Sequence, residues 1–365
     1  MPTFGSARQV LTEAIARRVF PAASVEVGTV TRVLWREAVG RLTYEAAADA
    51  TTPATVFDLA SLTKVIATAS LAMRFVDSGR IDLRAPVSQV LTRWSGPDRE
   101  GVCLADLLAH TAGLPPHRPY YEVMAGREAI ETAICQEPLG YLPRTASVYS
   151  DLGFLLLGFI LEDVGRVGLD VQFDHLMADL WWHAAERDGS EREDGGRELC
   201  FRPGAAWRAR TAPTRLDVAL GRPRQGEVDD LNAAALGGVA AHAGLFGTAP
   251  AVGAFAREVL GTWLARPGFG VVARPETLQR FTRRTGVAGS SRALAWDTML
   301  PTSSCGARMS PQAFGHTGFT GTSLWIDPGA GRYVVLLTNR VYPGADPASP
   351  ITDVRRAFHD AVMAS

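Results

Sequence analysis

The stretch Asp58-Leu-Ala-Ser-Leu-Thr-Lys64 places a serine and a lysine three residues apart, Ser61 and Lys64. Apolar residues follow at the spacing of a helix that buries one face, at positions 62, 65, 66, 69, 72, 73 and 76. The pattern predicts a buried helix that stops at Gly79, with Ser61 and Lys64 on one side of its first turn. The free backbone N–H groups at the N-terminus of a helix favour negative charge on the serine, and burial lowers the pKa of a lysine. Together these effects predict an activated serine nucleophile.

The composition is that of an ordinary globular protein. The chain has 365 residues, 47% of them apolar and 21% charged, which excludes disordered and fibrous classes. With 37 basic and 38 acidic side chains the net charge is −1, so we expect no nucleic-acid partner and no polybasic membrane anchor. The apolar run at 154–161 is too short to span a bilayer. The N-terminus has no signal-type apolar core, so the chain as given is predicted to be cytoplasmic, with a removed export signal left open.

The cysteines do not indicate a metal site. They are widely scattered, without a C-x-x-C pair or a Cys/His cluster: Cys103, Cys135, Cys200 and Cys305. We therefore expect no metal, no other cofactor and no disulfide framework.

Predicted strands lie near both ends of the chain, and the middle is mainly helical. The expected strands are 23–28, 33–40, 314–326 and 332–339, and the expected helices are 6–19, 104–113, 127–136, 152–164, 169–183, 250–265 and 351–363. The charged run at 186–197 is expected to be a surface loop. This order predicts an α+β fold, with an antiparallel sheet flanked by helices and an all-helical insert. The expected division is a sheet domain of 1–84 and 250–365 and a helical domain of 85–249, with the active site in the cleft between them.

Two further short motifs carry chemistry. Tyr149-Ser-Asp151 directly precedes a strongly apolar helix, and His316-Thr-Gly318 lies where glycines leave room beside a strand. Acyl transfer through a serine needs a nucleophile, a proton acceptor, a proton donor and an oxyanion hole of backbone N–H groups. The three motifs contain the residue types for all of these roles.

In this order the motifs resemble the serine β-lactamase and penicillin-binding-protein superfamily, whose pattern is S-x-x-K, then S-D-N or Y-x-N, then K-T-G. The tyrosine version, the separations and the segment Leu-Leu-Ala-His-Thr-Ala-Gly-Leu-Pro at 107–115 resemble its class C branch. That branch holds class C β-lactamases, D-alanyl-D-alanine carboxypeptidases, D-aminopeptidases and carboxylesterases. The resemblance covers about residue 20 to about residue 345, and it implies a β-lactamase/transpeptidase-like fold.

The resemblance also implies roles for single residues. Ser61 would be the acylated nucleophile, Lys64 its hydrogen-bonded partner, and Tyr149 the proton shuttle. Whether Lys64 or Tyr149 takes the first proton stays open, because both side chains have unperturbed pKa values of about 10. The oxyanion hole would be the backbone N–H groups of Ser61 and Phe319.

Two residues depart from the family pattern. His316 replaces the lysine of K-T-G, and a histidine is mostly neutral at pH 7, so H-T-G resembles DD-peptidase, D-aminopeptidase and esterase members better than dedicated β-lactamases. Asp151 replaces an asparagine that can donate a hydrogen bond, whereas an ionised aspartate only accepts. Asp151 therefore changes substrate handling, or it serves the lysine or the helix start. The expected substrate-binding residues are Asp151, His316, Thr317 and Gly318.

Two other histidines lie near these motifs. His110 is predicted to be structural, because it sits on a short helix before a Gly-Leu-Pro turn. His242 lies in the glycine-rich loop 236–248 and either lines the cleft or shapes the loop.

The sequence therefore predicts a serine hydrolase that forms an acyl-enzyme on Ser61 and acts on small esters or D-amino-acid amides and peptides. One alternative is a penicillin-binding-like protein that binds a β-lactam or peptide, or a class C-like β-lactamase, with little turnover. A third is a non-catalytic scaffold, which the intact Ser61, Lys64 and Tyr149 oppose. The expected partner is a small-molecule substrate, with no nucleic acid and no membrane span, and the oligomeric state stays open.

Overall fold

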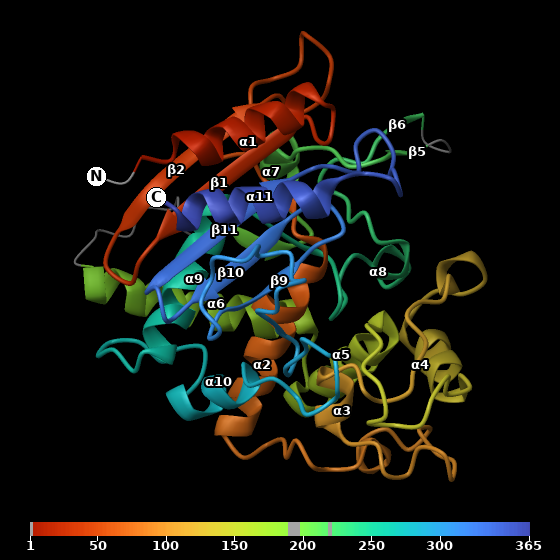
Figure 1. Ribbon diagram of the computed structural model, residues 1–365. Coiled ribbons are helices and arrows are strands. Elements are labelled where there is room, and N and C mark those ends of the chain that lie inside the picture. The colour runs from red at the N-terminus through yellow and green to blue at the C-terminus, as the bar shows by residue number, and fades with distance from the viewer. Residues whose placement is uncertain (1–2, 189–197, 218–220) are drawn as a thin grey trace.

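An antiparallel sheet that joins the two ends of the chain organises the fold (Figure 1). The computed structural model describes residues 3–188, 198–217 and 221–365. Within these ranges six strands run in the order β2-β1-β11-β10-β9-β8. Their bounds are Ala22–Gly28 (β1), Val33–Gly40 (β2), Asp297–Thr298 (β8), Phe314–Thr317 (β9), Ser323–Asp327 (β10) and Arg332–Thr338 (β11). The predicted α+β class with an antiparallel sheet is confirmed.

Both faces of this sheet are covered by helices. Successive residues of a strand point to opposite faces. On β11, Val334 and Leu336 therefore join the core under α1 and α11, whereas Val335 and Leu337 join the core under α9. Figure 1 shows α1 and α11 lying together over one face, with α9 behind the sheet. These three helices are Gly5–Ala16 (α1), Ala249–Trp263 (α9) and Ile351–Met363 (α11).

The middle of the chain supplies most of the other helices. The longer ones are Ala69–Asp77 (α2), Arg127–Gln136 (α4), Asp151–Gly165 (α5) and Leu169–Asp188 (α6). The shorter ones are Leu104–Leu108 (α3), Ala205–Arg208 (α7), Leu231–Ala235 (α8) and Pro275–Phe281 (α10), with 3₁₀ turns at Val87–Gln89 (η3) and Tyr120–Glu122 (η4). The small strands are Phe57–Asp58 (β3), Leu199–Phe201 (β4), Leu216–Asp217 (β5), Arg222–Pro223 (β6) and Leu245–Gly247 (β7).

Two predictions of local structure are wrong. In place of one helix from the serine onward, the chain forms a 3₁₀ turn, Ala60–Leu62 (η1), then a π-helical turn, Lys64–Thr68 (η2), and only then α2. Apolar spacing reports which side is buried and does not distinguish these helix types. The single strand expected at 314–326 is a hairpin of β9 and β10, and Gly321 in its turn has a φ of +99°.

Other expectations for the fold remain untested. The division into domains at residues 84/85 and 249/250 stays a prediction, since one buried cluster includes both sheet and helical residues. Most of the charged run at 186–197 lies outside the described residues. Among the described helices, none is both long and apolar enough to cross a membrane.

Candidate active site

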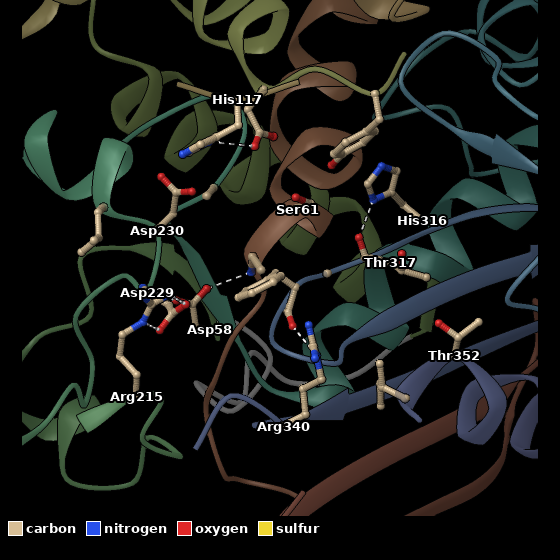
Figure 2. Close-up of a pocket in the computed structure, with 18 of the residues that line it drawn as sticks. Asp58, Ser61, His117, Arg215, Asp229, Asp230, His316, Thr317, Arg340 and Thr352 are labelled. Carbon is tan, nitrogen blue, oxygen red and sulfur yellow. Dashed lines mark hydrogen bonds and ion pairs between the residues drawn. The ribbon is translucent and has the colours of Figure 1, made fainter. Parts of the chain in front are cut away.

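A cavity of about 740 Å³ opens beside β9 and the η1 turn. Seven of the eight predicted site residues line it: Ser61, Tyr149, Asp151, His316, Thr317, Gly318 and Phe319. Figure 2 places Ser61 in the centre, between an acidic side with Asp58, Asp229 and Asp230 and an opposite side with His316, Thr317 and Thr352. The fold therefore brings together three motifs that lie far apart in the sequence.

Lys64, the eighth predicted residue, lies fully buried behind Ser61. Its Nζ donates hydrogen bonds to Oγ of Ser61 (3.0 Å), to Oδ1 of Asp151 (2.7 Å) and to the backbone carbonyl of His242 (3.1 Å). An ammonium has three donors and no acceptor, and here each of the three has a partner. Because Oγ of Ser61 accepts from the ammonium, its own hydroxyl proton remains available to a different acceptor.

The charges of Lys64 and Asp151 support each other. Burial acts to lower the pKa of Lys64, but Asp151 and Tyr149 outweigh it and the pKa is raised. Burial likewise acts to raise the pKa of Asp151, but the Lys64 charge and His117, whose Nδ1 is 3.9 Å from Oδ2, hold that pKa well below its usual range. Both groups are therefore ionised at neutral pH. The expectation that burial lowers the pKa of Lys64 is wrong, because Asp151 adds a negative charge that compensates for burial.

Tyr149 is held at the cavity by His110. The backbone N–H of Ser150 donates to Nδ1 of His110 (3.0 Å), and the rings of His110 and Tyr149 are 4.6 Å apart. Burial, together with the charges of Arg292 and Lys64, holds the pKa of His110 well below its usual value, so the ring stays neutral and Nδ1 can accept this bond. The predicted structural role of His110 therefore includes positioning the tyrosine.

His316 lies on β9 as a buried, neutral imidazole. Burial and the charges of Arg292 and Lys64 hold its pKa well below the usual value. Its Nδ1 lies 2.8 Å from the carbonyl of Thr317, so Nδ1 carries the proton and Nε2 is a free acceptor. Across the described chain, Nε2 finds no hydrogen-bond partner. His316 therefore brings no positive charge to the position where the family pattern has a lysine.

Arg292 brings a positive charge to this part of the cavity. Its guanidinium lies 4.8 Å from the centre of the Tyr149 ring. Nζ of Lys64 lies 4.9 Å from the centre of the same ring. Arg340 is a second arginine of the cavity wall. Neither arginine forms an ion pair with a carboxylate of the described residues. Sequence reasoning missed both, because neither belongs to a local motif.

Two backbone N–H groups at the cavity, those of Ser61 and Phe319, donate no hydrogen bond within the parts of the chain that the structure describes. The loop 318–322 that carries Phe319 is fixed against the strand that leads to Ser61. Thr320 Oγ1 donates to the carbonyl of Asp58 (2.8 Å), and Thr322 Oγ1 donates to the carbonyl of residue 59 (3.1 Å). The two free N–H groups therefore belong to segments that are bonded to each other.

Glycine and a left-handed backbone allow this close approach. A Cβ on Gly318 would lie 2.7 Å from the carbonyl oxygen of Leu59, which is closer than such contacts occur. Ala60, directly before the serine, has a φ of +48°, a conformation that is strained for alanine. Such strain is common at functional sites, where the surrounding structure maintains it.

The carboxylates on the acidic side of the cavity are bound by other groups of the protein. Asp58 accepts from the backbone N–H groups of Ala60 (2.8 Å) and Asp229 (2.7 Å), and burial together with the Asp229 charge raises the pKa of Asp58 to about 7. Asp229 is bound by Arg215 through two hydrogen bonds of 2.8 and 2.6 Å.

His242 pairs with the remaining acidic residue of this side. Its Nε2 lies 2.9 Å from Oδ1 of Asp230, and its backbone carbonyl accepts from Lys64. The imidazole is not part of the cavity wall. Of the two roles considered for His242, the structure supports shaping of the loop.

Comparison with known proteins identifies a family for this chain. A family model described as Beta-lactamase matches residues 7–357. A curated relative from Salmonella gallinarum, named "Putative D-alanyl-D-alanine carboxypeptidase", is 29% identical over 333 residues, which cover 80% of this chain and 71% of that protein.

Two solved structures show the same fold. One is EstCE1, described as a hydrolase with promiscuous acyltransferase activity, with a TM-score of 0.71, 22% identity and 97% of both chains covered. The other is a class C beta lactamase from Rhodobacter sphaeroides, with a TM-score of 0.73, 19% identity and 98% of both chains covered. The family model spans nearly the whole sequence, and so this chain belongs to the beta-lactamase family of serine hydrolases.

Proposed function

We propose that this chain hydrolyses short peptides or esters through an acyl-enzyme on Ser61, and that its preferred leaving groups carry a carboxylate. The observation that carries the proposal is the position of Ser61. Its Oγ lies at the cavity wall, 3.0 Å from the buried ammonium of Lys64. A nucleophile beside a fixed cation and a cavity is the arrangement that acyl transfer requires.

In the proposed mechanism Tyr149 accepts the hydroxyl proton of Ser61. Lys64 is already protonated and donates to Oγ, so it is unsuited to that step. The charges of Lys64 and Arg292, both near the Tyr149 ring, would stabilise a phenolate.

The remaining steps follow from the proton on Tyr149. Oγ forms a bond to the substrate carbonyl carbon, and the N–H groups of Ser61 and Phe319 bind the resulting oxyanion. Tyr149 then returns its proton to the leaving amine or alcohol as the bond to the acyl carbon breaks. Water attacks the acyl-enzyme by the same route in reverse and releases the acid.

The charges of the cavity support a leaving group with a carboxylate. Arg292 and Arg340 lack carboxylate partners among the described residues, and Thr317 adds a hydroxyl to the same wall. A substrate carboxylate would provide the missing anionic partner, and charge-assisted hydrogen bonds are among the stronger ones. The carboxylates of the acidic side are already paired with other groups, so they are not available as partners for Arg292 or Arg340. The carboxypeptidase name of the Salmonella relative agrees with such a substrate.

A matched pair of peptides tests the proposal. We would compare an N-acetylated peptide ending in D-alanyl-D-alanine with the same peptide ending in the C-terminal amide, alongside p-nitrophenyl butyrate and nitrocefin. The wild type should cleave the acid form faster than the amide, and Ser61→Ala should cleave neither. Arg292→Gln should reduce the preference for the acid form.

The same panel separates the alternatives. Equal rates for both peptides, with fast ester hydrolysis, would restrict the function to an esterase. A stable β-lactam adduct in the intact mass spectrum, without turnover of any peptide or ester, would favour a penicillin-binding-like protein.

A further inference from the structure

Arg355, on α11, is buried beside the loop 318–322. Its guanidinium donates hydrogen bonds to three backbone carbonyls of this loop. Nη2 donates to Gly318 (2.6 Å) and Thr322 (2.9 Å), and Nε donates to Gly321 (3.2 Å). A planar fork of donors can hold several acceptors in a fixed geometry, which a single ammonium cannot do. Arg355 therefore fixes the backbone of this loop.

The charge of Arg355 has no carboxylate partner within the described ranges. Burial, followed by the nearby charge of Arg340, lowers the pKa of Arg355 to about 9, so the side chain is still mainly a cation at pH 7. Burying a charge without an opposite charge costs stability. The carbonyl oxygens of the loop carry partial negative charges, and they are the groups that bind this cation.

The bond to Gly318 helps to set the direction of the next N–H group, and the same carbonyl also accepts from the backbone N–H of Gly321 (3.0 Å). In a trans peptide the C=O and N–H groups point in opposite directions. The carbonyl of Gly318 points to Arg355, so the N–H of Phe319 points away from α11. The turn before Ser61 is close by, since a Cβ on Gly318 would lie 3.2 Å from Cβ of Ala60.

We propose that Arg355 is a positioning residue of the oxyanion hole, and this rests on the function proposed above. It holds the peptide between Gly318 and Phe319 so that the Phe319 N–H faces the carbonyl attacked by Ser61. Its charge also polarises that peptide, because hydrogen bonds in a chain strengthen one another. Arg355 touches no reacting atom and acts through the Phe319 N–H.

Three variants test this role. Arg355→Met keeps the length of the side chain but removes its charge and donors, and Arg355→Lys keeps the charge but not the fork. Arg356→Met is the matched control: it removes an arginine from the next position of α11, whose Nη2 donates to the carbonyl of Pro301 (2.5 Å). Rates of p-nitrophenyl butyrate hydrolysis would be measured per active site, counted by labelling with a fluorophosphonate. Inhibition by phenylboronic acid would also be measured, because its tetrahedral serine adduct places an oxygen in the oxyanion hole.

We expect Arg355→Met to lower kcat by about 10- to 100-fold with little change in KM. The affinity of the variant for phenylboronic acid should fall by a similar factor. Arg355→Lys should lie between this variant and the wild type, and Arg356→Met should match the wild type. A purely structural role would lower the number of active sites but leave kcat per site and boronic-acid affinity unchanged, which would overturn the proposal.

Two further outcomes are decisive. If Arg355→Met does not fold, the test rests on Arg355→Lys. A kcat of Arg355→Lys equal to that of the wild type would then overturn the positioning role. If the wild type itself is not labelled at Ser61, the proposed hydrolase function fails, and the role of Arg355 in it fails too.

Discussion

Nζ of Lys64 and Oδ1 of Asp151 are 2.7 Å apart and form an ion pair behind the candidate nucleophile. The raised pKa of Lys64 and the lowered pKa of Asp151 both favour the charged forms. The family pattern has an asparagine at this position, which would not add this negative charge. In the proposed mechanism the pair therefore makes Lys64 a permanent cation and leaves proton transfer to Tyr149.

Replacing Asp151 by asparagine should change the pH dependence of the rate. In the wild type Lys64 has a raised pKa and stays charged throughout the assay range. In Asp151→Asn, burial would no longer be opposed by the carboxylate, so the pKa of Lys64 would fall and the ammonium would be lost as the pH rises. We expect kcat/KM for p-nitrophenyl butyrate to fall about tenfold between about pH 6 and about pH 9 in the variant only. Faster alkaline hydrolysis by the variant would instead make neutral Lys64 the base.

Removing the hydroxyl of Tyr149 should strongly slow hydrolysis. Tyr149→Phe should lower kcat/KM by about 10²- to 10⁴-fold, the usual contribution of a positioned acid–base group. Tyr44→Phe is the control, because its hydroxyl donates to the Arg18 carbonyl (2.8 Å) outside the cavity wall. This control should hydrolyse the substrate at the wild-type rate, although its own Tm should be lower. Equal rates for Tyr149→Phe and the wild type would rule out the tyrosine as the shuttle.

Removing one backbone N–H should test the oxyanion hole directly. Phe319→Pro deletes the N–H of this position, whereas Phe319→Ala keeps it and removes only the ring. We expect the proline variant to lose about 10²- to 10³-fold in kcat, and the alanine variant to stay close to the wild type. Circular dichroism would verify that both variants are folded. Similar rates for two folded variants would show that the Phe319 N–H does not bind the oxyanion.

The buried His359 should make stability depend on pH. Its Nε2 lies 2.9 Å from Ser323 Oγ, and burial, followed by the Arg355 charge, lowers its pKa to about 3. In the unfolded chain a histidine titrates near a pKa of about 6.5, so between these values the unfolded state binds more protons. Stability is therefore lost as the pH falls below about 6.5, by about 2 kcal/mol at pH 5 for this residue alone.

His359→Gln should remove this part of the pH dependence. Urea unfolding at about pH 7 and about pH 5 would measure it, and the wild type should lose about 2 kcal/mol more than the variant. Equal losses would mean that the histidine is protonated in the folded protein.

The sequence predicted the three motifs and their meeting at one site, because short motifs in a fixed order are readable without a structure. The α+β class was also predictable, since β1 and β11 have the apolar pattern of strands at the two chain ends. The helix types around Ser61 were not. Hydrogen bonds to distant segments hold this region, such as the one from Thr68 Oγ1 to the carbonyl of Ala241 (2.6 Å), and no local pattern reports them.

The charges around the motifs could not be predicted either. Arg292, Arg340 and Arg355 reach the cavity from separate segments and have no motif of their own. The pKa of Lys64 depended on Asp151, and the sequence showed the substitution but not the contact. The raised pKa of Asp58 likewise depends on Asp229, which only the fold brings close. Electrostatics of this kind requires the tertiary structure.

The most direct test of the account is the intact mass of the protein after reaction with a fluorophosphonate. We predict a single adduct on the wild type, mapped by peptide sequencing to Ser61, and no adduct on Ser61→Ala of the same thermal stability. An unlabelled wild type, or a Ser61→Ala variant that is labelled as efficiently as the wild type, would contradict the assignment of Ser61 as the nucleophile.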